Sequence, residues 1–231
     1  MFEYHEKFKK YFNIKEKPSV EEEILYKKVL KYTKPISRIP CVKGIFVCNS
    51  LSMNATNENS DIDLFIVSSN NRLWIVRILT TLYFQLLGNR RTSKNIKNNF
   101  CLSFFCTENG VLKFNNIKIE NDIYLFFWIY YLKTIVDKNN IYEKLLSLFN
   151  IKEHNSNFDK YRINKNYKNT NKKYKFFDLL EILLKKIFIK KTINHKNKLK
   201  NPWGVIINDD MLKFHDNDIR IKIRNELLND K

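Results

Sequence analysis

Two aspartates separated by one residue are the part of this sequence best suited to chemistry. Asp61 and Asp63 begin the apolar run Leu64-Phe65-Ile66-Val67, whose β-branched and aromatic content predicts a buried strand. Residues i and i+2 of a strand share a face, so the two carboxylates are expected to project together. Mg²⁺ commonly binds such carboxylates together with substrate phosphates. The pattern also fits a simpler arrangement, in which one aspartate caps the loop and the other is solvated at the strand end.

The segment before the aspartates adds a second polar feature. A strand-like run from Gly44 to Cys48 ends at the pair Asn49-Ser50, and an asparagine-rich loop then leads to Asp61. A serine hydroxyl and exposed N–H groups at the start of a helix suit phosphate oxygens. The predicted order is therefore a strand, a small polar turn, a loop or short helix, and a strand that opens with Asp-x-Asp.

This order resembles the nucleotidyltransferase superfamily, in which a Gly-Ser turn precedes Asp-x-Asp on the next strand of a polymerase-beta-like fold. The resemblance implies Mg²⁺-dependent transfer of a nucleoside monophosphate from a nucleoside triphosphate to an acceptor hydroxyl of RNA, protein or a small molecule. It implies that Asp61 and Asp63 are catalytic and hold two Mg²⁺ ions, and that Asn49 and Ser50 hold the triphosphate. The runs FCLSFFCTE, NDIYLFFWI and LKFHDNDIR are similar to bacterial nucleotidyltransferase-domain proteins of unassigned role.

Two positions depart from the family pattern. Asn49 stands in place of the turn glycine, and asparagine tolerates a left-handed backbone better than most residues. The strand-like run from Phe100 to Phe105 has no acid where the family carries a third carboxylate. Cys101 and Ser103 share one face of this run, and Ser103 is expected to take the third place, beside the nucleotide. The missing acid keeps open a catalytically reduced nucleotide- or RNA-binding module. A partner protein of the toxin–antitoxin type, a kind of system in which small nucleotidyltransferases occur, is a further alternative that the resemblance implies.

Composition indicates a globular, strongly basic protein. The 231 residues are 44% hydrophobic and carry a formal net charge of +18, which favours nucleic acid or another polyanion as a partner. A basic loop next to the aspartates is the most plausible local contact with RNA or another polyanion, and it contains Arg90, Arg91, Lys94 and Lys97. A composition rich in lysine, asparagine and isoleucine also arises from AT-biased coding, so the charge has a second explanation.

The four cysteines form no C-x-x-C pair, which indicates buried free thiols in a reducing cytoplasm rather than a zinc site. The chain begins without the layout of a secretion signal, and a cytoplasmic location is expected. In the tail, His215, Asp216 and Asp218 fit either a metal site or the cap of a helix, and a cap is the preferred interpretation.

The remaining patterning predicts an α+β fold. Residues 1–120 are expected to form the polymerase-beta-like core, a small mixed sheet flanked by helices, and residues 121–231 a mostly helical region with a polar, flexible segment near 154–175. The apolar run at 123–136 is predicted to be one buried helix, too short to span a membrane, and no transmembrane segment is expected. Asn109-Gly110 predicts a hairpin turn into a strand at 111–114. The lysine-flanked helix at 176–189 fits packing against other helices or contact with a membrane surface.

Overall fold

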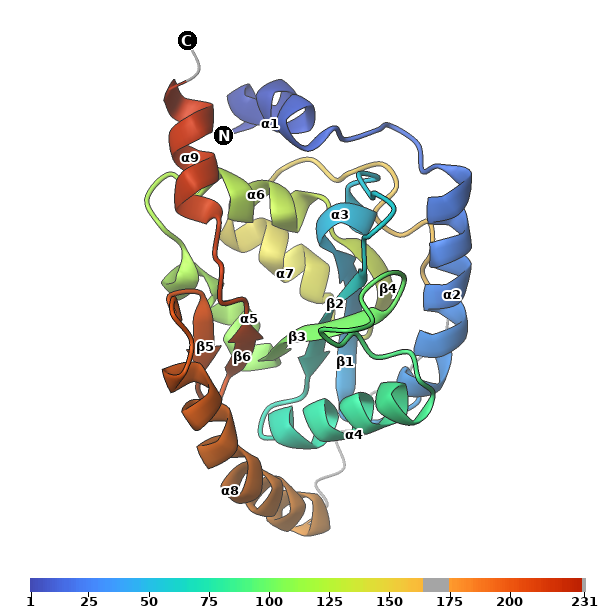
Figure 1. Cartoon of the computed structure of the whole chain (residues 1–231), viewed down its shortest axis with the longest axis vertical. Helices are drawn as coiled ribbons and strands as arrows, with labels where there is room; N and C mark the ends of the chain where they lie inside the picture. Colours follow the sequence, from blue (N-terminus) through green and yellow to red (C-terminus); the bar gives the residue numbers. More distant parts are fainter. Residues whose placement is uncertain (164–174, 230–231) are drawn as a thin grey trace.

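A six-stranded mixed sheet forms the centre of the protein in the computed structural model, which describes residues 1–163 and 175–229 (Figure 1). The strands lie in the order β4-β1-β2-β3-β6-β5. β2 and β3 are parallel, and every other neighbouring pair is antiparallel. This arrangement confirms the predicted α+β class. The strands are β1 (Val42–Cys48), β2 (Ile62–Ser68), β3 (Phe100–Thr107), β4 (Lys133–Asp137), β5 (Val205–Ile207) and β6 (Met211–Phe214).

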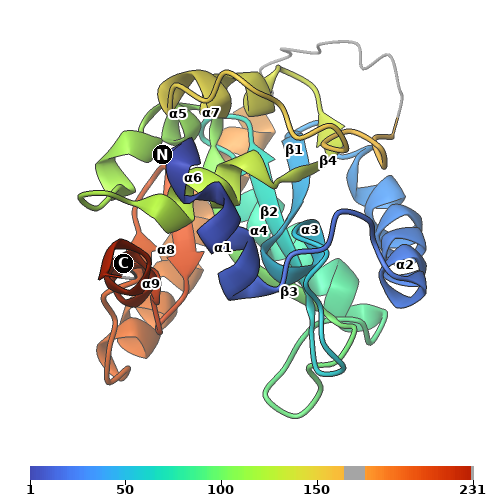
Figure 2. The same cartoon turned by 90° about the horizontal axis from the view of Figure 1, so that it is seen from above.

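Helices cover both faces of the sheet, and α6 and α2 lie on opposite sides of β1 and β2 (Figure 2). One core joins the sheet to α1, α6, α7 and α9, and the other joins it to α2, α4 and α8. The helices are α1 (His5–Phe12), α2 (Val20–Ile36), α3 (Asn49–Ser52), α4 (Leu73–Leu86), α5 (Glu108–Leu112), α6 (Ile123–Tyr130), α7 (Ile141–Leu148), α8 (Lys175–Asn197) and α9 (Arg220–Asn229), with short 3₁₀ turns at Phe2–Tyr4 and Phe114–Ile117.

The central strands are apolar on both faces because each face has its own core. Phe46 of β1 and Phe65 of β2 pack on the side of α6, whereas their neighbours Ile45 and Ile66 pack on the side of α2 and α4. All seven residues of β1 and all seven of β2 are buried. A strand buried on both faces has a continuous apolar run instead of a polar alternation, which explains why these two strands were evident from the sequence.

Polar side chains determine where several helices begin. Ser19 and Glu22 form a capping box at the start of α2. A less expected cap joins two helices: Glu181 of α8 accepts the backbone N–H groups of Trp74 and Ile75 at the start of α4, at 2.8 and 2.9 Å. The predicted helix at 176–189 therefore packs on α4 through a buried carboxylate. No helix in the described ranges is long and apolar enough to cross a membrane.

Two local predictions were wrong. The helix expected at 123–136 ends at Tyr130, and residues 133–137 form strand β4, which pairs with β1. Asn109-Gly110 lies inside α5 rather than in a hairpin, because Thr107 caps that helix by accepting the Gly110 N–H at 3.0 Å. β5 and β6, formed by the tail, extend the sheet beyond β3, so the region after residue 120 supplies half of the strands. Residues 164–174, half of the segment predicted to be flexible, lie outside the described residues.

Candidate functional site

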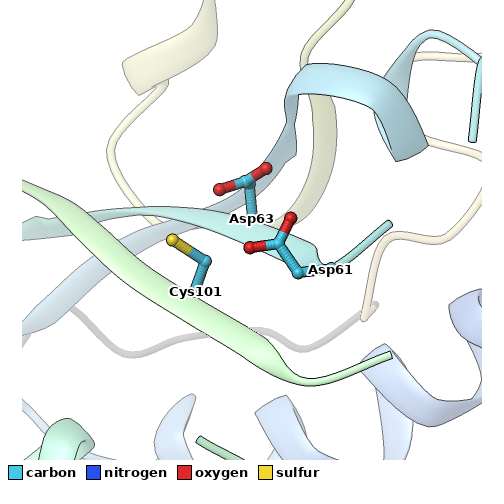
Figure 3. A group of neighbouring side chains, drawn as sticks. All are labelled: Asp61, Asp63 and Cys101. Atoms are coloured by element: carbon cyan, nitrogen blue, oxygen red, sulfur yellow. The ribbon is translucent and has the colours of Figure 1, made fainter. Parts of the chain in front are cut away.

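The two aspartates meet one cysteine where β2 lies between β1 and β3. Asp61 immediately precedes β2, and Asp63 pairs in register with Cys48 of β1 and Cys101 of β3. One carboxylate oxygen each of Asp61 and Asp63 and the Sγ of Cys101 all lie within 4.8 Å of one another (Figure 3). The two carboxylates therefore project together, as the strand periodicity predicts.

The register of β3 determines which of its side chains joins the aspartates. Between Asp63 and Phe65, β2 advances two residues while β3 advances three, so β3 bulges just after Cys101. Ser103, predicted for the third place, instead lies within 2.9 Å of the His215 Nε2 through its hydroxyl. The Cys101 thiol donates to the same hydroxyl at 3.3 Å. Cys101 is thus the direct neighbour of the acids, and Ser103 contacts Cys101 through its hydroxyl.

Asn49 connects the turn after β1 to the acid pair. Its backbone is left-handed, with φ of 57°, as the substitution of asparagine for glycine allows. Its Oδ1 accepts hydrogen bonds from the Trp128 indole N–H at 2.9 Å and from the Tyr124 hydroxyl at 3.3 Å. The same side chain lies beside Asp63, where it favours the ionised carboxylate and so opposes the rise in the pKa of Asp63. Ser50, half-buried, follows as the second residue of α3.

One residue of the predicted basic loop reaches the acids. The Arg91 Nε lies 2.9 Å from the Asp61 Oδ2, and its guanidinium also lies 3.6 Å from the Cys101 Sγ. Arg90 points elsewhere and donates to Gln85 at 3.3 Å. Lys94 and Lys97 are exposed, so a polyanion contact through the whole loop remains a prediction.

Burial and mutual repulsion make the acid pair costly to ionise. Burial, and then the charge of Asp61, raise the pKa of Asp63 to about 6. Burial also raises the pKa of Asp61, against the opposing charge of Arg91. The pKa of the Cys101 thiol is raised by burial and by the neighbouring Asp63. A cation bound at this position would stabilise the ionised form of all three groups and so lower their pKa values.

The donor set fits a divalent cation in part. Carboxylate oxygens suit Mg²⁺, so Asp61 and Asp63 meet that requirement. The third donor is a thiol, which Mg²⁺ does not favour. The tail residues His215, Asp216 and Asp218 do not form a comparable ligand group in the described part of the chain. Asp218 instead accepts the Arg220 N–H at 3.2 Å at the start of α9, which confirms the cap interpretation for this residue.

A cavity of about 200 Å³ adjoins the site on the side of α6. The charged side chains that line the cavity form ion pairs with protein carboxylates. Lys213 and Arg220 each pair with Asp218, at 2.8 and 2.9 Å, and Arg220 also pairs with Asp122 at 2.9 Å. Burial lowers the pKa of His215 to about 4, so its ring is neutral at pH 7. The lining consists of Asn49, Phe104, Ile117, Tyr124, Leu125, Trp128, Lys213, His215, Asn217, Asp218, Ile219 and Arg220.

Sequence reasoning missed the support that α6 gives to the site. Trp128 and Tyr124 lie in an apolar run that predicts only a core helix, and nothing local indicates that their polar atoms reach Asn49. All four cysteines are buried and free, as predicted. Comparison of the chain with protein-family models, curated proteins and solved structures returned no match. The geometry of the site is therefore the basis for a functional proposal.

Proposed function

We propose that this protein is a nucleotidyltransferase that uses a divalent cation to transfer a nucleoside monophosphate from a nucleoside triphosphate to an acceptor hydroxyl. One observation carries the proposal: the carboxylates of Asp61 and Asp63 converge next to the left-handed turn formed by Asn49 and Ser50. Acids for a cation and a turn for phosphates then lie side by side, which is the arrangement that phosphoryl and nucleotidyl transfer requires.

Each residue has a role that follows from its contacts. Asp61 and Asp63 would hold Mg²⁺, which when bound neutralises charge on the phosphates. Asn49 lies beside Asp63 and is itself held by Trp128. The hydroxyl of Ser50 and the turn would hold the triphosphate. Arg91 is close enough to Asp61 to contact a phosphate bound at the same place.

A second candidate function is a nucleotide-binding module without turnover. The observation that favours it is the β3 position beside Asp63, where Cys101 provides no carboxylate to activate the attacking hydroxyl. The ion pair between Arg91 and Asp61 also neutralises part of the acid pair. Both features leave binding of a nucleotide intact while removing a base that catalysis would use.

Calorimetry with all four nucleoside triphosphates, with and without Mg²⁺, tests the proposal. We expect Mg²⁺-dependent binding that the Asp61→Asn/Asp63→Asn variant loses, and transfer of label from an α-labelled triphosphate to RNA or protein. The control is Asp159→Asn/Asp209→Asn, which removes two exposed carboxylates and should bind normally. Binding without transfer to any acceptor class would support the module, whereas equal binding by the two double variants would refute the site.

A further inference from the structure

The third donor beside the two aspartates differs in chemical type from the other two. The Cys101 Sγ lies within 4.8 Å of a carboxylate oxygen of Asp61 and of Asp63, and the three side chains are neighbours (Figure 3). Thiolate sulfur is a soft ligand that favours Zn²⁺ and related ions, whereas carboxylate oxygen accepts hard and borderline cations alike. An O, O, S set therefore matches a borderline cation better than it matches Mg²⁺.

The backbone holds this thiol in place. Cys101 pairs with Asp63 across the parallel β2–β3 ladder. A bulge in β3 follows, and the next pair in the ladder is Phe65 with Phe104. Cys101 is 5% exposed, and its thiol donates to the Ser103 hydroxyl, which in turn contacts His215. Since the ligands of one tetrahedral Zn²⁺ lie at about 2.0–2.3 Å from the ion, atoms already within 4.8 Å of one another need only a small closure to share it.

We infer that Cys101 converts the Asp61–Asp63 pair into a three-ligand site for a thiophilic divalent cation of the Zn²⁺ class. The inference rests on the proposed function in using the same two carboxylates, and it changes the expected metal preference of that site. Binding of such an ion releases the thiol proton to solvent and leaves a thiolate–metal bond. The ion also competes with the Arg91 guanidinium, which lies near both Asp61 and Cys101.

Co²⁺ is the probe for this site, because a thiolate ligand gives it a near-ultraviolet sulfur-to-metal charge-transfer band that oxygen ligands do not give. We expect the wild-type protein to show the band on titration with CoCl₂ and to lose it on addition of ZnCl₂. Cys101→Ser should lose the band and bind Zn²⁺ about 100-fold more weakly, because even a second-shell change commonly costs about 10–100-fold in metal affinity. Cys101→Asp should lose the band while gaining affinity for Mg²⁺.

Cys41→Ser is the matched control. It removes another buried cysteine, at the opposite end of β1 from Asp63, and should keep both the band and the Zn²⁺ affinity. Circular dichroism of each variant verifies folding, and Cys101→Asp provides a second test if Cys101→Ser is unstable.

The outcomes separate the inference from the proposed function. A wild-type protein that binds Co²⁺ without the band, that binds no Co²⁺, or whose band survives in Cys101→Ser would overturn the inference. If Mg²⁺-dependent triphosphate binding persists in those cases, the proposed function stands without it. A band that depends on Cys101, in a protein that binds no triphosphate, would support the thiol ligand and refute the nucleotidyltransferase.

Discussion

The indole N–H of Trp128 donates to the Oδ1 of Asn49 over 2.9 Å and so links α6 to the turn that follows β1. Asn49 in turn lies beside Asp63, so the acid pair is at the end of a chain of contacts that begins in the helical core. The position of one candidate ligand therefore depends on a helix that follows it in the sequence by more than fifty residues.

Substitution of Asn49 should separate its side-chain role from its backbone role. Asn49→Gly keeps the left-handed turn but leaves the Trp128 N–H without its acceptor, and we expect a loss of about 1–3 kcal/mol in the free energy of unfolding. Asn49→Ala should lose roughly 1 kcal/mol more, because alanine is strained at a positive φ. Urea denaturation measures both values. Asn71→Gly, at an exposed left-handed position, should change stability by no more than about 0.5 kcal/mol, and equal losses at the two sites would contradict this role of Asn49.

The raised pKa of Asp63 predicts a stability cost above mildly acidic pH. The folded protein retains the proton of this carboxyl up to about pH 6, whereas an ordinary aspartate releases it near 3.8, so wild-type stability should fall as the pH rises between these values. Asp63→Asn should therefore be more stable than wild type at pH 8, by an amount on the order of 1–3 kcal/mol, with the difference vanishing near pH 4. Chemical denaturation at several pH values, with Asp159→Asn as the control, tests this sign. If Asp63→Asn were less stable than wild type at pH 8, the predicted cost of ionising Asp63 would be contradicted.

Removal of the Arg91 guanidinium should strengthen cation binding. Arg91 occupies a carboxylate oxygen of Asp61, and Arg91→Gln ends that competition, so we expect a several-fold tighter Kd for Mn²⁺ or Co²⁺ by calorimetry. Because the Arg91 side chain is 45% exposed, its ion pair should contribute no more than about 1 kcal/mol to folding. Arg90→Gln removes the neighbouring charge without touching Asp61. Equal effects of the two variants would indicate general electrostatics instead of competition.

The buried ion pairs beside the cavity should be sensitive to loss of one partner. Arg220 pairs with Asp122 and Asp218, and its side chain is 9% exposed. Arg220→Met leaves both carboxylates without that partner, and we expect a loss of about 3–5 kcal/mol in the free energy of unfolding. Arg224→Met, one turn further along α9, removes a half-buried arginine that has no carboxylate partner and should cost no more than about 1 kcal/mol. A similar loss from both would show that the effect comes from the helix and not from the buried pairs.

Local sequence was sufficient for β1, β2 and the acids. The apolar runs of β1 and β2 are continuous because both faces of the sheet are covered, and the i, i+2 spacing alone places Asp61 and Asp63 on one side. Asparagine at position 49 predicted a left-handed turn, which the backbone adopts. These features depend on intrinsic conformational preferences and on periodicity, and both are determined by a few consecutive residues.

Contacts between distant segments could not be predicted in this way. The choice of Cys101 over Ser103 depends on a bulge in the β2–β3 register, and residues 133–137 form a strand because β1 has a free edge to pair with. Arg91 reaches Asp61 through the course of a loop, and Trp128 reaches Asn49 through the packing of α6. An isolated apolar run specifies burial but not its partner, because hydrophobic free energy is non-directional. The amino-acid sequence thus supplied the two carboxylates, and the packing of strands and helices supplied the thiol, the guanidinium and the amide that surround them.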